Sequence, residues 1–135
     1  MTATVTYESN LRTTCTHLQS GSNFETDAPT DNKGKGERFS PTDLIATGLG
    51  ACMITTMGIK AESMNIALDG AKVEVTKVMV SDPRRIGKII THLTIPAGLN
   101  LDEKTKEILE RAAHHCPVVK TLHPEVELEI SFNWQ

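Results

Sequence analysis

The chain has 135 residues and a formal net charge of −3, with acidic and basic residues intermixed. This length predicts a single domain over residues 1–135 with a core of its own. No basic run is longer than Arg84–Arg85, which argues against a nucleic-acid surface. The odd count of three cysteines argues against a secreted disulfide framework, and no apolar segment typical of a signal peptide follows Met1, so we expect a cytoplasmic protein.

The first 40 residues predict three short strands and a loop. Thr2–Glu8 alternates apolar and polar residues, and Leu11–Leu18 is rich in threonine, so the two segments predict a hairpin. Asn23–Ala28 follows a turn and predicts a short third strand. Pro29–Glu37 is polar and glycine-rich, which is typical of a loop. This loop is either a plain surface connection or a lid that faces a substrate.

A long helix begins near Ser40. Ser40 suits the N-cap, Pro41 suits the first helical position, and Asp43 suits the third position of a capping box. Leu44–Ile59 is almost uncharged and carries apolar or small residues on every side, which predicts a buried helix. Threonine and glycine are mixed into this run, so it is a poor membrane span and we expect no membrane partner.

The second half of the chain predicts both strands and helices. A slip in the apolar alternation at Thr76–Lys77 predicts a β-bulge in the first of these strands. The predicted elements are a strand at Ala71–Ser81, a strand at Ile86–Ile95, an amphipathic helix at Leu101–His115, a short helical segment at Cys116–Leu122 and a strand at Val126–Phe132. Together with the first half, they predict an α+β domain.

Two of the three cysteines lie where chemistry is plausible. Cys52 is in the apolar helix, one turn after Gly48, whose missing side chain either makes room for a ligand or partner backbone or allows close helix packing. Cys116 precedes Pro117 and so lies near a helix N-cap, where backbone N–H groups lower the pKa of a thiol. A buried, inert role remains the alternative for both cysteines. Cys15 lies in a predicted strand and has no assigned role.

The sequence His114–His115–Cys116 does not predict a metal site. Adjacent residues on a helix diverge by about 100°, so these three side chains cannot all bind one ion. No second ligand pair at zinc spacing accompanies them. We therefore expect no metal.

Two motifs resemble the signatures of the OsmC/Ohr family. SPTDLIATGLGAC, from Ser40 to Cys52, resembles the helix signature, and AAHHCPVVKTL, from Ala112 to Leu122, resembles the second cysteine motif. The two cysteines are 64 positions apart, which also agrees with the family. The resemblance implies an α+β OsmC-like fold, with antiparallel sheets wrapped around central helices in an intertwined homodimer.

The resemblance also implies a peroxiredoxin-like, thiol-dependent peroxidase active in oxidative stress. Cys52 would be the peroxidatic thiolate that attacks an organic hydroperoxide or hydrogen peroxide, and Cys116 would resolve it through a disulfide. A dithiol would serve as reductant, with no metal or flavin cofactor. The pKa argument from the residues points first to Cys116, whereas the resemblance points to Cys52.

The chain departs from the family pattern at two points. Thr42 stands where family peroxidases have a glutamate, and Asp43 lies about 180° around the helix from Cys52, so it is better interpreted as a cap. For the family arginine, Arg38 is a plausible substitute or a surface charge, with Arg12 or the partner subunit as other sources. The alternative function is a non-catalytic stress or small-ligand-binding dimer that holds an apolar ligand and has redox-sensitive cysteines.

Overall fold

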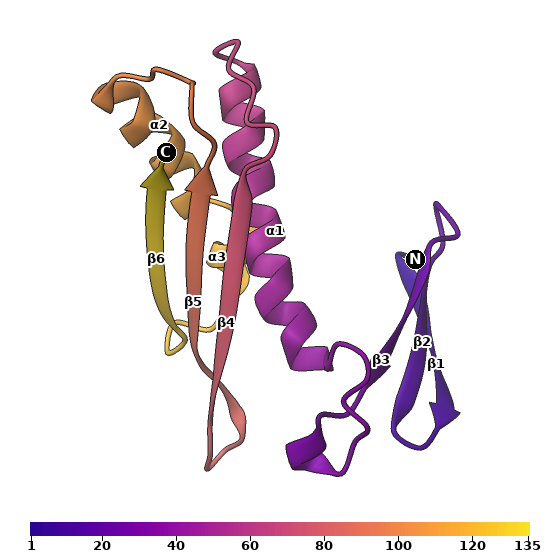
Figure 1. The fold of residues 1–135 in the computed structure, drawn as a ribbon. Coiled ribbons are helices and arrows are strands. Elements are labelled where there is room, and N and C mark those ends of the chain that lie inside the picture. The colour runs from indigo at the N-terminus through magenta and orange to yellow at the C-terminus, as the bar shows by residue number, and fades with distance from the viewer. The chain divides into compact units, whose positions relative to one another are not determined.

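The strands and helices follow the predicted order along the chain. The computed structural model describes all 135 residues and divides them into two compact units, Met1–Ile45 and Ala46–Gln135. The elements are β1 (Ala3–Ser9), β2 (Arg12–His17), β3 (Asn23–Asp27), the 3-10 turn η1 (Thr30–Asn32), α1 (Pro41–Glu62), β4 (Lys72–Val80), β5 (Arg85–Ile95), α2 (Glu103–His114), α3 (Pro117–Thr121) and β6 (Glu127–Trp134) (Figure 1). The mixed α and β composition confirms the predicted fold class.

The first unit is built on an antiparallel sheet. Its strand order is β1-β2-β3, and Val5, Cys15 and Phe24 lie opposite one another across the three strands. Every residue of β1 is exposed, and so is Phe24 of β3. The loop after β3 contains the single turn η1, and Glu37 near its end pairs with Arg12 of β2 at 3.0 Å. This contact ties the end of the loop to the sheet.

The second unit contains a mixed sheet, which corrects one part of the prediction. Its strand order is β4-β5-β6; β4 pairs with β5 in antiparallel orientation, but β5 pairs with β6 in parallel. We expected antiparallel sheets. The difference arises because α2 and α3 carry the chain back across the sheet between β5 and β6, and such a crossover returns a strand in the same direction.

The predicted bulge exists, but its position was wrong. The pairing register of β4 shifts between Val78 and Met79, and not at Thr76–Lys77. Exposure alternates without a break through Lys77, which lies on the same half-buried side of the strand as Met79. A lysine can cover apolar surface with its aliphatic stem, so its charge interrupts the hydrophobic pattern without interrupting the register.

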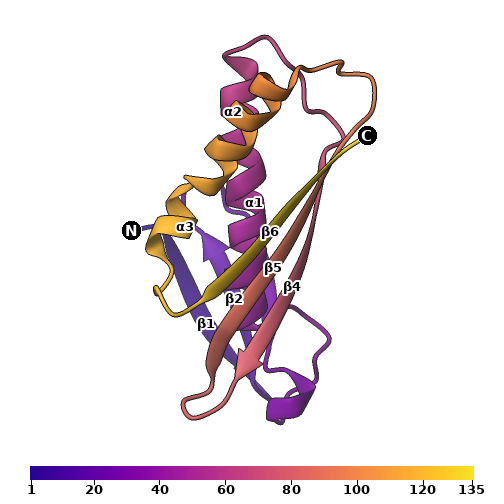
Figure 2. The same ribbon diagram turned by 90° about the vertical axis from the view of Figure 1, so that its left-hand side faces the viewer.

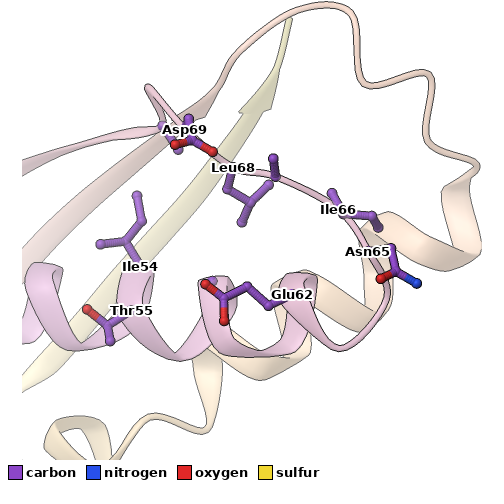
Figure 3. Close-up of a pocket in the computed structure, with 10 residues that line it drawn as sticks. Ile54, Thr55, Glu62, Asn65, Ile66, Leu68 and Asp69 are labelled. Atoms are coloured by element: carbon purple, nitrogen blue, oxygen red, sulfur yellow. The ribbon is translucent and has the colours of Figure 1, made fainter.

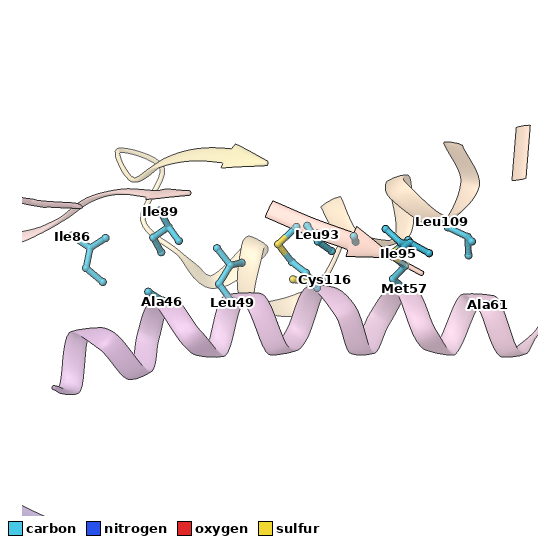
Figure 4. Close-up of a cluster of buried hydrophobic side chains, with 12 residues drawn as sticks. Ala46, Leu49, Met57, Ala61, Ile86, Ile89, Leu93, Ile95, Leu109 and Cys116 are labelled. Carbon is cyan, nitrogen blue, oxygen red and sulfur yellow. The ribbon is translucent and has the colours of Figure 1, made fainter. Parts of the chain in front are cut away.

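Helix α1 lies along the sheet of the second unit, and α2 and α3 lie beside it (Figures 1 and 2). Figure 4 shows the cluster that joins these elements, in which Leu49 and Met57 of α1 meet Leu93 of β5 and Leu109 of α2. All four side chains are fully buried. The core of this unit is therefore aliphatic, and α1 supplies one wall of it.

Within one chain, α1 is buried on one side only. The buried side consists of Ala46, Leu49, Gly50, Met53, Met57 and Ala61. On the opposite side Ala51 and Thr55 are exposed, and Ile59 is 65% exposed. By length and composition alone the helix could cross a membrane, and a single helix of this kind is weak evidence for a membrane span.

Candidate functional site

The structure brings Cys52 and Cys116 together. Cys52 is half-buried in the middle of α1, whereas Cys116 is fully buried and belongs to the same core cluster as Leu49 and Leu93 (Figure 4). Cys52 packs against the cluster that contains Cys116, and its thiol is close enough to raise the pKa of Cys116. None of the three cysteines forms a disulfide in this structure, and Cys15 lies on β2 in the first unit.

The break between α2 and α3 gives Cys116 its position. Helix α2 ends at His114, and His115 caps it by donating its backbone N–H to the carbonyls of Ala112 and Ala113. Cys116 has an extended backbone, with φ −64° and ψ 150°, and is the N-cap of α3. Pro117 has no N–H to continue α2, so the helix restarts after Cys116 and the thiol turns inward.

The pKa of the Cys116 thiol is shifted in the direction opposite to the one that the sequence predicted. Burial raises the pKa of the Cys116 thiol, and the nearby Cys52 sulfur raises it further. Backbone N–H groups of Val119 and Val118 lower the pKa, as predicted for an N-cap, but they do not outweigh burial. The expectation that Cys116 has a lowered pKa was therefore wrong. Cys116 is suited to remain a protonated thiol beside Cys52.

The glycines near Cys52 have different surroundings. A Cβ added to Gly50 would lie 2.7 Å from the Cγ2 of Val75 and 3.3 Å from the Cγ1 of Val73, so Gly50 allows α1 to approach β4 closely. A Cβ added to Gly48 would meet nothing within 4 Å. Close packing therefore explains Gly50. Gly48 leaves open space one helical turn before Cys52.

The start of α1 forms the predicted cap. The Ser40 N–H donates to the Asp43 carboxylate at 2.8 Å, and the Asp43 N–H donates to the Ser40 hydroxyl at 3.1 Å. These reciprocal bonds form a capping box and confirm the structural role of Asp43. The hydroxyl of Thr42 lies 3.2 Å from that of Ser40.

The candidate arginines belong to the first unit. Arg38 is 48% exposed; its Nε donates to Glu25 at 3.0 Å and its Nη1 to the Glu37 carbonyl at 3.1 Å. Arg12 binds Asp27 with two hydrogen bonds of 2.7 and 2.8 Å. The Asp27 carboxyl is buried, and its hydrogen bonds from Arg12 lower its pKa. Arg12 is thus held more rigidly than Arg38.

A groove that the sequence did not predict lies along the second half of α1. It has a volume of about 640 Å³ and separates α1 from the segment that leads to β4. Figure 3 shows Ile54 and Glu62 of α1 on one side and Leu68 and Asp69 on the other. Neither Cys52 nor Cys116 lines it, so the groove is separate from the thiol pair.

Known proteins resemble this chain over most of its length. A family model described as OsmC-like protein matches residues 34–131. A crystal structure from Psychrobacter arcticus 273-4, described as an osmotic stress induced and detoxification response protein, is 47% identical with a TM-score of 0.94, and the match covers 98% of this chain and 96% of that chain. No match was found among curated proteins.

Two more distant structures are described as organic hydroperoxide resistance proteins. OsmC of Legionella pneumophila is 20% identical with a TM-score of 0.76, covering 97% of this chain and 94% of that chain. OhrB of Bacillus subtilis is 22% identical with a TM-score of 0.68, covering 98% of both chains. At these identities the likeness concerns the fold alone.

Proposed function

The chain belongs to the OsmC-like protein family, as its two cysteine motifs predicted, and on this premise we propose that it reduces hydroperoxides with Cys52 and Cys116. The observation that carries the proposal is the packing of the half-buried Cys52 against the core cluster that contains the fully buried Cys116. The cysteines are 64 positions apart in the sequence, so only the fold brings them together. Such a pair can alternate between dithiol and disulfide.

In the proposed reaction, the Cys52 thiolate attacks one oxygen of the hydroperoxide. The O–O bond breaks, the substrate leaves as an alcohol after taking up a proton, and Cys52 becomes a sulfenic acid. The Cys116 sulfur then displaces hydroxide from the Cys52 sulfenic acid, which releases water and forms a disulfide. A dithiol reductant returns both cysteines to thiols. The raised pKa of Cys116 supports this order, because a protonated thiol does not compete for the peroxide.

We assign the cation that the Cys52 thiolate needs to Arg38. Its contact with Glu25 is an exposed ion pair, and such pairs contribute only about 0–1 kcal/mol, so Arg38 can change partners at little cost. Arg12 is the less suitable source because Asp27 and Glu37 already occupy its guanidinium. The planar fork of Arg38 can hold both a thiolate and a peroxide oxygen.

The assembly that we propose is a cytoplasmic homodimer. Eleven large hydrophobic residues have exposed side chains, and eight of them lie in Met1–Ile45, a unit too small to bury them. The free side of α1 adds Ile59 to this surface. A second copy of the chain would cover such surfaces in a closed assembly. The open space over Gly48 would then hold the apolar part of an organic hydroperoxide.

The test is the consumption of cumene hydroperoxide and of hydrogen peroxide in the presence of dithiothreitol. We expect turnover by the wild type, a preference for the organic hydroperoxide, and loss of turnover in Cys52→Ser. Cys15→Ser is the matched control, because Cys15 has no role in the proposed reaction, and it should keep the wild-type rate. Equal rates for wild type and Cys52→Ser would reject the proposal.

Thr42 favours a second candidate function. It replaces an acidic residue that accompanies the thiols in family peroxidases, and its hydroxyl is engaged with Ser40 of the cap. In this alternative the dimer holds a small apolar ligand, and the cysteines are oxidised without turnover. One oxidation per chain, with no further peroxide consumption when dithiothreitol is in excess, would support it.

A further inference from the structure

A second groove lies between the end of α1 and the outer side of α2. It has a volume of about 390 Å³ and is lined by Lys60, Ile108, Arg111, Ala112 and His115. Ile108, Arg111 and Ala112 are spaced three and four residues apart, so one side of α2 contributes all three. The volume is within the range of small-ligand sites. Neither cysteine of the proposed peroxidase lines this groove.

The groove combines an apolar floor with a cationic rim. Ile108 and Ala112 are half-buried and supply the apolar surface, whereas Lys60, Arg111 and His115 are exposed. The His115 Nδ1–H donates to the Arg111 carbonyl at 2.7 Å, which fixes the orientation of the ring. No carboxylate lines the groove. An amphipathic anion would complement both parts of this surface.

The two cations of the rim lack acidic partners. Neither Lys60 nor Arg111 forms an ion pair, although the chain has 17 acidic residues for 14 basic ones. The cations that pair with carboxylates include Arg12, Arg38, Lys72, Arg85, Lys88 and Lys106. Lys60 and Arg111 each lie in the last turn of a helix, where the helix dipole favours a cation. The dipole does not explain why both line one groove with an apolar floor.

We propose that this groove binds a small organic anion, with its carboxylate between Lys60 and Arg111 and a short alkyl chain over Ile108 and Ala112. Charge complementarity selects the head group, because the rim offers two positive charges and no competing carboxylate. The apolar floor selects a ligand with a hydrocarbon part over an inorganic anion. This site is independent of the thiol pair, so the proposal stands or falls separately from peroxidase activity.

The experiment is a titration of the reduced wild-type protein with octanoate, followed by NMR of the backbone amides. We expect a Kd on the order of 1 mM or below, with the largest shifts at Ile108, Ala112 and His115. Lys60→Gln/Arg111→Gln should weaken binding about tenfold, which corresponds to about 1.4 kcal/mol. Lys104→Gln is the matched control, because Lys104 is an exposed residue of α2 outside the groove, and it should keep the wild-type Kd.

Three further measurements separate the proposal from simpler explanations. Octanol has the same chain without the charge and should bind at least tenfold more weakly. Vesicles of phosphatidylglycerol test whether the cations serve a membrane surface instead; binding to vesicles without binding to octanoate would overturn the proposal. So would equal affinity of octanoate for the wild type and the double variant, or shifts outside the groove. The single variant Arg111→Gln provides the same comparison if the double variant fails to fold.

Discussion

Substitution of Gly50 by alanine tests the packing of α1 against β4. The added methyl group would lie 2.7 Å from Val75 and 3.3 Å from Val73, and both valines have stiff side chains. Overpacking of this kind costs about 1–3 kcal/mol, and the better helix propensity of alanine returns about 1 kcal/mol. We therefore expect Gly50→Ala to lower the free energy of unfolding by about 1 kcal/mol and the Tm by about 4 °C.

Gly48→Ala and Gly58→Ala are the matched comparison, because an added Cβ meets nothing within 4 Å at either position. In both variants the helix propensity alone should raise the free energy of unfolding by up to about 1 kcal/mol. Gly48 is one turn before Cys52, so Gly48→Ala should also slow the consumption of cumene hydroperoxide, whereas Gly58→Ala should not. Thermal unfolding is measured at one fixed protein concentration, because the proposed dimerisation would contribute to the Tm.

Two results would contradict this reasoning. A Gly50→Ala protein as stable as the wild type would show that Val73 and Val75 shift freely, and that α1 does not pack tightly on β4. Gly48→Ala with the same stability and the same activity as Gly58→Ala would show that the space near Cys52 has no function. Sedimentation of Gly48→Ala distinguishes loss of activity by filling of this space from loss of activity by dissociation.

Four further predictions follow from the thiol pair and the exposed surfaces. Mild peroxide should form a disulfide between Cys52 and Cys116 and leave Cys15 free, and peptide mass mapping that finds Cys15 in the bridge would refute the pairing. Sedimentation at micromolar concentration should give about twice the chain mass of 14.8 kDa. A stable, folded monomer would show that α1 needs no partner. Alkylation of Cys116 should require a pH above the ordinary thiol range, because burial raises its pKa and only the thiolate reacts. Arg38→Ala should move the alkylation profile of Cys52 to higher pH, by one unit for each ~1.4 kcal/mol of lost interaction, while the Cys116 profile stays in place; an unchanged Cys52 profile would exclude Arg38.

Local signals in the sequence were sufficient for the elements that frame the site. Ser40 and Asp43 predicted the capping box because their bonds join residues three apart and depend on nothing distant. Pro117 predicted the restart of the helix after Cys116 for the same reason. The pairing of Cys52 with Cys116 came from the family motifs instead, because no local rule relates positions 64 residues apart.

The pKa of Cys116 and the direction of β6 depend on distant parts of the chain, so local signals did not predict them. The pKa of Cys116 depends on two opposing effects, and the sequence shows only the backbone N–H groups that follow the thiol. The burial that outweighs them comes from the core cluster, whose members such as Leu49 and Leu93 are distant from Cys116 in the sequence. The direction of β6 was missed for a similar reason: strand periodicity is the same in parallel and antiparallel pairs, so only the crossover through α2 and α3 determines it.

The composition of α1 did not predict which side of the helix a single chain buries. Apolar residues on all sides predict burial on all sides, yet a single chain buries only the side that carries Leu49, Met53 and Met57. The remaining side is as apolar as a protein core but is not packed against other residues of the chain; its Ile59 is 65% exposed. An exposed apolar side on the helix that carries the half-buried Cys52 places the proposed peroxidatic thiol beside the surface that the proposed dimer would cover. If the proposed dimer covers this surface, peroxide consumption and dimer formation should be lost together as the protein is diluted.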